Sequence, residues 1–327
     1  MPALITHHLF GERSATLLPE GVITSEEELL AFLLGNQGPD PFFFRMLTTP
    51  ERGSEARALA HEMHDGHMTS AFLALREGVG HLPAADAGIG RAFALGMLSH
   101  YALDRVAHPF VYAQQYAIVE AADDLYDADS EVHAVIESDL DTWMLWKLRR
   151  ATVHDCPPAS ELVHTERICR VAGALMSQVA WETFGLKVGA SEYAGAVADM
   201  ELCYRSIEPH GSLRGVGLGI IERAVRSHSL LQALSHRVST SDECAAANLD
   251  HEEWVNPFTR VASNESFPEV FDRALKGWPT LSEAFTHGGE ELRAAVAGLN
   301  YSGMPLGTDE APESADDAEQ GGVTVEA

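Results

Sequence analysis

The sequence predicts an all-α protein. Apolar residues recur at helical spacing along most of the 327 residues, and no segment shows the clear alternation of a half-buried strand. No glycine-rich phosphate-binding loop is present either. Hydrophobic residues make up 46% of the chain, enough to bury a large core. Length alone allows one large domain or two of ordinary size.

Helix caps, apolar faces and breaking residues predict where the main helices lie. The first opens at Thr24 with a hydroxyl cap and acidic residues that complement the helix dipole, and it ends before GNQGPDP. The third is expected to end at His108, because Pro109 cannot continue the hydrogen-bond ladder. The expected helices cover residues 24–34, 54–76, 87–108, 130–147, 160–184, 191–207, 212–236 and 266–298.

Charge and cysteine content exclude several classes of protein. The formal net charge of −27 opposes stable binding to nucleic acid or anionic lipid, which relies on a basic surface. Four cysteines without a CxxC pair fit reduced thiols better than a disulfide framework or a thiolate metal site. We see no signal peptide and no transmembrane segment, so we expect a cytoplasmic protein.

The stretch HYALDRVAHPF, residues 100–110, carries the most specific spacing. Steps of four residues turn only about 40° around a helix axis, so His100, Asp104 and His108 share one face. Three ligands rising along a helix are too spread for one ion, but neighbouring ions could share Asp104. His133 and Glu137 repeat the spacing on another helix. An isolated pair of this kind is more often a surface ion pair, yet the apolar surroundings here would make unpartnered charges costly.

Further candidate ligands lie upstream. They are His7 and His8 in THHLF, Asp40 in GNQGPDPFFF, and His61, His64 and His67 in HEMHDGH. A helix can point only part of the last cluster inward, so at least one of its histidines should be solvated. Asp40 fits an Asx turn or helix cap as well as it fits a functional carboxylate. The aromatic run after it is more typical of core than of an apolar lip for acyl chains.

Five motifs in one order resemble the bacterial zinc-dependent phospholipase C family, which is related in fold to the P1-type nucleases. The motifs are THHLF, GPDPFFF, MHDGH, LSHYALDRVAHPFVY and HAVIESDLD, within residues 1–150. NLDHEEWVNPFTRVASNESF, residues 248–267, is more weakly similar to the C-terminal part of cytosolic, mostly uncharacterised members. The resemblance implies a helical bundle around a polynuclear site of two or three Zn²⁺ ions.

The resemblance also implies a role for each candidate. The first zinc would be held by His64, His100 and Asp104, the second by His108, His133 and Glu137, and the third by His7 and the bridging Asp104. Asp40 would orient or deprotonate the attacking water. The choices of His7 over His8, and of His64 over His61 or His67, rest on motif register.

The beginning of the chain departs from the family pattern. Secreted members complete the third site with a processed N-terminal tryptophan, whereas this chain begins MPALITHH. Pro2, the next candidate for an N-terminal ligand, lies only five residues before His7. We expect the third zinc to be weak, differently ligated or absent.

The implied function is phospholipase C-like hydrolysis of a phosphodiester by metal-activated water. The expected partner is a phosphate-ester small molecule or a phospholipid head group. Two alternatives stay open: a nuclease-like phosphodiesterase, and a non-catalytic helical protein that zinc only stabilises. Closed structural sites would bind no exchangeable water.

The motifs suggest three parts of the chain. Residues 1–150 should form the metal-binding catalytic core, and residues 151–303 a C-terminal helical part packed on it within the same domain. Residues 304–327 should form an acidic tail. Its last twenty residues hold seven acidic residues, no basic residue and no aromatic residue, so they cannot bury enough apolar surface to become ordered.

Overall fold

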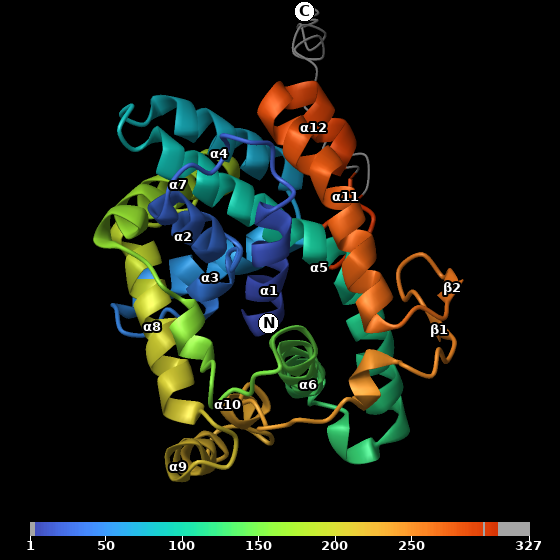
Figure 1. Cartoon of the computed structure of the whole chain (residues 1–327). Coiled ribbons are helices and arrows are strands. Elements are labelled where there is room, and N and C mark those ends of the chain that lie inside the picture. Colours follow the sequence, from blue (N-terminus) through green and yellow to red (C-terminus); the bar gives the residue numbers. More distant parts are fainter. Residues whose placement is uncertain (1–3, 297, 307–327) are drawn as a thin grey trace, which may run out of the picture.

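A long helix, α5 (Ala87–Ala121), runs through the middle of the fold (Figure 1). The computed structural model describes residues 4–296 and 298–306. Helices from both ends of the chain pack on α5: α1 (Leu4–Ala15), α2 (Glu26–Gly35), α4 (Met68–His81), α6 (Asp129–Arg149), α7 (Glu166–Phe184) and α11 (Phe267–His287). Their buried apolar side chains form one core cluster. The predicted all-α class is confirmed.

The remaining elements extend the bundle on its outer sides. They are η1 (Asp40–Phe44), α3 (Pro50–Asp65), η2 (Asp123–Leu125), η3 (Pro158–Glu161), α8 (Ser191–Ile207), α9 (Leu213–Glu222), α10 (Leu230–Ala233), η4 (Ala245–Ala247) and α12 (Gly289–Val296), where η denotes a 3-10 helix. Strands β1 (Trp254–Val255) and β2 (Ala262–Ser263) form an antiparallel hairpin. Within the described residues, no helix is both long and apolar enough to cross a bilayer.

Helix α5 does not end at His108, and this prediction was wrong. Pro109 lies inside the helix, which continues to Ala121. A proline removes one hydrogen bond, and the contacts of the buried Phe110 and Val111 with the core keep the next turns in place. The Arg105 carbonyl oxygen would accept the backbone N–H of residue 109 if that residue were not proline. It lies beside Gly303, and a Cβ atom on Gly303 would come within 2.4 Å of it.

Other helix boundaries also differ from the prediction. The segment expected as one helix over 54–76 is split into α3 and α4, because the chain turns at Gly66 and at His67, which has φ 61°. Residues 212–236 form α9 and α10, and residues 266–298 form α11 and α12 with a break at Gly288. Helix α7 begins at Glu166 rather than at residue 160. Helix α1 and the hairpin were not predicted.

Close contact between α2 and α5 positions one wall of the candidate site. A Cβ atom on Gly35 would lie 2.3 Å from the Phe93 carbonyl oxygen, and one on Gly96 would lie 2.1 Å from the Phe32 carbonyl oxygen. Both glycines therefore let the two backbones touch. The chain then turns at Gly38 (φ 59°), where a Cβ atom would come within 2.3 Å of the His100 ring. This turn brings η1 and its aspartate onto α5.

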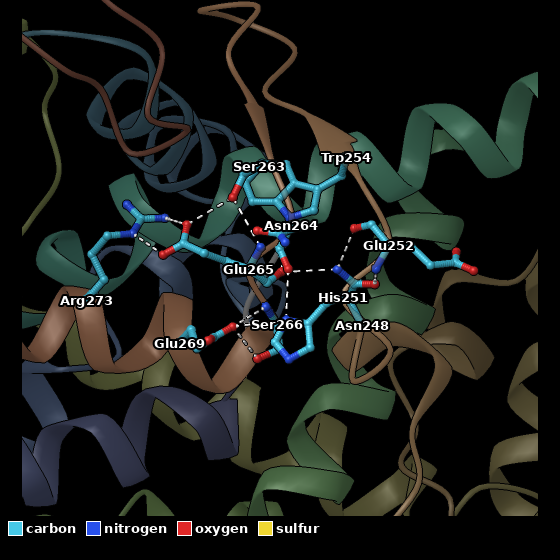
Figure 2. Close-up of polar contacts among 10 residues, drawn as sticks. All are labelled: Asn248, His251, Glu252, Trp254, Ser263, Asn264, Glu265, Ser266, Glu269 and Arg273. Carbon is cyan, nitrogen blue, oxygen red and sulfur yellow. Dashed lines mark hydrogen bonds and ion pairs between the residues drawn. The ribbon is translucent and has the colours of Figure 1, made fainter.

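A polar network anchors the hairpin between α5 and α11 (Figure 2). Asn248 Nδ2 donates to the carbonyl oxygens of Glu252 (2.9 Å) and Glu265 (3.2 Å), and Asn248 Oδ1 accepts from the Glu252 N–H. Trp254 Nε1 also donates to the Glu265 carbonyl, at 3.0 Å, while its ring packs edge-on against Phe110. The segment that resembles the C-terminal part of family members, residues 248–267, therefore forms the hairpin itself and most of the network that anchors it.

The end of the described chain also folds back on the bundle. The Leu306 N–H donates to the Gly298 carbonyl, and the Asn300 N–H donates to the Met304 carbonyl. Residues 304–306 of the predicted tail thus pair with residues 298–300, because these hydrogen bonds and the packing of Leu306 on the core order them. The rest of that predicted tail, residues 307–327, lies outside the described residues, as do residues 1–3.

Candidate metal centre

Eight candidate side chains meet inside the bundle, and they come from five elements. Helix α1 contributes His7, η1 contributes Asp40, α3 contributes His64, α5 contributes His100, Asp104 and His108, and α6 contributes His133 and Glu137. All except the half-buried His64 are buried. Their ligand atoms form three groups, each within 4.8 Å: His7, His100 and Asp104; Asp40, His64 and His100; and His108, His133 and Glu137.

Asp104 stands between imidazoles from two helices. Its Oδ1 lies 3.0 Å from His7 Nε2, and its Oδ2 lies 3.0 Å from His100 Nε2. The rings of His7 and His100 stack, with centroids 4.0 Å apart. His108 Nδ1 lies 3.8 Å from Asp104 Oδ2, so one carboxylate faces both ends of the cluster. A bridging ligand needs this position.

Asp40 forms the second group with two histidines. Its Oδ1 lies 3.2 Å from His64 Nε2, and its Oδ2 lies 3.8 Å from His100 Nε2. The structure therefore places His64 with Asp40 and His100, whereas the resemblance pairs it with His100 and Asp104. His100 belongs to both of the first two groups.

The third group joins α5 to α6. His133 Nε2 lies 3.1 Å from Glu137 Oε1, and His108 Nε2 lies 3.5 Å from the same oxygen. A cavity of about 20 Å³ lies between this group and the first one, and His7, Asp104, His108 and Glu137 contribute to its lining. A space of this size holds about one water-sized particle.

The outer ring nitrogen of four of the histidines is already engaged. His64 Nδ1 contacts the Ala60 carbonyl oxygen at 2.7 Å, His100 Nδ1 that of Asn36 at 3.1 Å, and His108 Nδ1 that of Tyr301 at 2.8 Å. His133 Nδ1 contacts Gln115 Oε1 at 2.8 Å. A carbonyl oxygen can only accept, so each Nδ1 donates its proton, and Nε2 is the nitrogen of each ring that can offer a lone pair to an ion in the cluster.

The imidazole nitrogens and carboxylate oxygens that face the interior of the cluster are better suited to bind a cation than to pair with one another. Among the described residues, the buried Nε2 atoms of His100 and His133 make no hydrogen bond, although carboxylate oxygens lie 3.0 and 3.1 Å away. Buried polar atoms are usually satisfied, and imidazole with carboxylate is the ligand chemistry of zinc. The residues present therefore fit the ion that the resemblance implies.

Electrostatics keep the carboxylates in the form that binds metal. Burial raises the pKa of Asp104, but the charges of His100, His108 and His7 outweigh it and hold that pKa well below its usual value. Burial likewise raises the pKa of Glu137, and the neighbouring His133 brings it far below the usual range. The pKa of His133 is lowered, chiefly by burial. An ionised carboxylate and a neutral imidazole are the ligand forms.

The other histidines considered from the sequence point elsewhere. His8 pairs with Glu161, with Nε2 2.7 Å from Oε2, on the far side of α1 from Asp104. His61 and His67 are exposed, and their rings contact Phe43 and Phe184. Within the described part of the chain, none of these three histidines belongs to a candidate ligand group.

Three supporting residues were missed from the sequence. Gln115 lies seven residues after His108 on the same face of α5, and the assumed end at Pro109 concealed this relation. Asn36 offers only its backbone carbonyl. Tyr301 is buried, and its ring lies 4.9 Å from that of His64 and 5.5 Å from that of His100. No local signal in the sequence links Tyr301 to residues two hundred positions away.

Comparison with known proteins gives one family match. Residues 6–172 match the family described as zinc dependent phospholipase C. The matched range is half of the chain and contains all eight candidate side chains. No curated protein and no solved structure gives a significant match.

Proposed function

Because the chain belongs to the zinc-dependent phospholipase C family, we propose that it hydrolyses phosphodiesters with a zinc-activated water, and that its substrate is a phospholipid or a related phosphate ester. The observation that carries this proposal is the buried convergence of five imidazoles and three carboxylates in three overlapping groups. Helix packing alone does not account for such a set, since burying these groups without partners costs free energy.

We propose His108, His133 and Glu137 as ligands of one zinc ion. His7, His64, His100 and Asp104 would hold one or two more, with Asp104 between the ions. Bound zinc would offset negative charge on the ester oxygens and lower the pKa of a bound water from about 15.7 toward about 7.

The chain's own residues would prepare this chemistry in two ways. The acceptors on Nδ1 orient four of the ligand histidines, so that Nε2 of each ring faces the ion. We propose that Asp40 orients or deprotonates the attacking water as a general base. Its place between His64 and His100 also allows it to be a ligand, and the two roles make different predictions.

The direct test is hydrolysis of phosphatidylcholine by the zinc-loaded protein, measured as the release of phosphocholine. A chelator and the substitution Asp104→Asn should each abolish turnover. Asp139→Asn is the matched control, because Asp139 lies on α6 two residues after Glu137 but lines a different cavity, with Trp143 and Arg237. Turnover that survives both the chelator and Asp104→Asn would refute the proposal.

The same assay separates the two alternatives. Cleavage of single-stranded nucleic acid without hydrolysis of phosphatidylcholine would identify a nuclease-like enzyme, which the net charge of −27 disfavours. A lower melting temperature on chelation without turnover of any ester would identify a purely structural role. The cytoplasmic location stays a prediction.

A further inference from the structure

Helix α9 turns most of its large apolar side chains to solvent and buries two of its three glycines. Leu213, Ile220 and Ile221 are 94%, 65% and 70% exposed, whereas the buried residues of this helix are Gly215 and Gly219. A Cβ atom on Gly215 would lie 2.8 Å from the Ile207 carbonyl oxygen, and one on Gly219 would lie 2.4 Å from a side-chain nitrogen. The tightly packed glycine face thus fixes which side of α9 points outward. A helix of an ordinary soluble domain has the opposite arrangement.

The exposed apolar residues form one stripe. Side chains three, four, seven and eight positions apart share a helix face, and the spacing of these residues matches. We call the set the α9 face: Leu213, Val216, Ile220, Ile221 and, just beyond the helix, Val225. Contiguous exposed apolar surface of this kind marks an interaction site more often than chance exposure does.

Arginines border this stripe in a chain that is otherwise acidic. Residues 209–237 contain four arginines and one glutamate, whereas the whole chain has a net charge of −27. At 100° per residue, Arg214 and Arg223 fall on opposite sides of the part of the stripe that lies within α9, from Leu213 to Ile221, and both are exposed. The one acidic residue, Glu222, is turned inward and accepts hydrogen bonds from Ser229 Oγ and the Leu231 N–H. Arg214 and Arg223 therefore place a positive side chain on each border of the stripe.

The segment that directly follows α9 contacts the helix that carries part of the candidate metal centre and the turn before it. Arg226 Nη2 pairs with Glu131 Oε1 at 2.8 Å, and Ser227 Oγ donates to Asp127 Oδ2 at 3.0 Å. Glu131 is two residues before His133 on α6. Figure 1 shows α9 at the margin of the fold, next to α10 and beyond α6.

We propose that the α9 face docks the protein on a phospholipid bilayer that contains anionic lipid. This inference rests on the proposed function and deepens it. Docking would bring the active site to its lipid substrate. An apolar stripe bordered by arginines is the pattern of a helix that lies in the membrane interface, where guanidinium groups meet lipid phosphates. The acidic remainder of the chain would be repelled by the same surface, which orients the molecule with α9 toward the membrane.

A second copy of the chain is a poorer occupant of this face. A two-fold contact places the same patch against itself, so it would bring the bordering arginines of both helices together. The basic border complements an anionic lipid surface instead.

The test measures binding of the zinc-loaded full chain to sedimenting vesicles. Vesicles of phosphatidylcholine mixed with phosphatidylglycerol are compared with phosphatidylcholine alone, at low and high salt. Wild type should bind the mixed vesicles more tightly, and salt should weaken this binding. The double substitution Ile220→Ser with Ile221→Ser should weaken it about tenfold or more, since both side chains would enter the acyl boundary. Arg214→Glu should weaken binding to the mixed vesicles only.

Val163→Ser with Trp181→Ser is the matched control, because these side chains are also 53% and 60% exposed but belong to α7 and the segment before it, not to α9. This variant should bind as wild type does. Failure of wild type to bind, or equal binding by the Ile220 and Ile221 variant, would overturn the proposal. A wild-type dimer that this variant converts to a monomer would also overturn it, in favour of a contact between copies. Sedimentation reports binding whether or not lipid is hydrolysed, so a lack of hydrolysis would count against the proposed function alone.

Discussion

Gln115 holds His133 from outside the candidate ligand set. Gln115 Oε1 accepts from His133 Nδ1 at 2.8 Å, and its Nε2 donates to Asp129 Oδ1 at 3.1 Å. Gln115→Leu would leave the Nδ1 proton without an acceptor, and we expect it to weaken zinc affinity about 10- to 100-fold. Competition with a chromogenic chelator measures this. Gln114→Leu is the control, since Gln114 bonds the Ala246 carbonyl instead. Equal losses in both variants would refute the role of Gln115.

Asp40→Asn distinguishes a base from a ligand. If Asp40 acts on the water, the variant should keep its full metal content and lose turnover, because the amide cannot accept the proton. If Asp40 binds the ion directly, metal content should fall as well. We expect the first result, and elemental analysis beside the hydrolysis assay decides. Unimpaired turnover with unchanged metal would exclude both roles.

The residues of the centre were predictable where their spacing is local. His100, Asp104 and His108 share one face of one helix, so sequence spacing alone brings them together, and the pair on α6 follows in the same way. The grouping across elements was not predictable in detail. His64 meets Asp40 through the turn at Gly38, and Tyr301 reaches the centre through a segment that no local pattern connects to it.

At the level of elements, the contact between α2 and α5 depends on two glycines. We expect Gly96→Ala to lower the free energy of unfolding by about 1–3 kcal/mol, because the added Cβ atom would meet the rigid Phe32 carbonyl at 2.1 Å. Urea unfolding measures the change. The control is Gly277→Ala in the middle of α11, where a Cβ atom has no neighbour within 4 Å. This substitution should stabilise by about 0.5–1 kcal/mol through helix propensity. Equal effects of the two substitutions on the free energy of unfolding would show that α2 and α5 do not pack this closely at Gly96.

Helix existence was easier to predict than helix ends. Residues 130–147 and 191–207 correspond closely to α6 and α8, because each segment carries a continuous apolar face, although neither helix begins with a side-chain cap. Breaks at Gly66 and Gly288 lie within continuous apolar patterns, so periodicity could not reveal them. Pro109 failed as a stop signal because tertiary packing outweighed one lost hydrogen bond. The hairpin has only two paired residues per strand, too few for an alternating pattern.

At the scale of the whole molecule, a second buried polar network joins the start of α1 to α6 and to two residues of the C-terminal half of the chain. Asp141 on α6 accepts from the backbone N–H groups of Ile5 and Thr6 at the start of α1, at 2.9 and 2.7 Å. His236 Nε2 lies 3.0 Å from the same carboxylate, and its Nδ1 lies 2.6 Å from Glu208 Oε1. This network holds α1, and with it His7, against α6.

The network predicts a loss of stability at alkaline pH. Burial lowers the pKa of His236, but hydrogen bonds to Asp141 and Glu208 raise it to about 9. The folded chain thus keeps a proton that the unfolded chain releases near pH 6.5. This stabilisation is complete below about pH 6.5 and is lost as the pH rises through about 9, on the order of 3 kcal/mol. Urea unfolding across this range should show a steeper decline for wild type than for His236→Asn. Parallel declines would contradict this assignment.

The central claim is that buried imidazoles and carboxylates from separate helices hold clustered zinc ions. The most direct measurement is metal per chain by elemental analysis of the purified protein, of His100→Ala and of His133→Ala. We predict at least two zinc ions for wild type and the loss of about one ion in each variant, since each removes a ligand from a different group. Wild type without zinc, or variants with unchanged zinc content, would contradict the account.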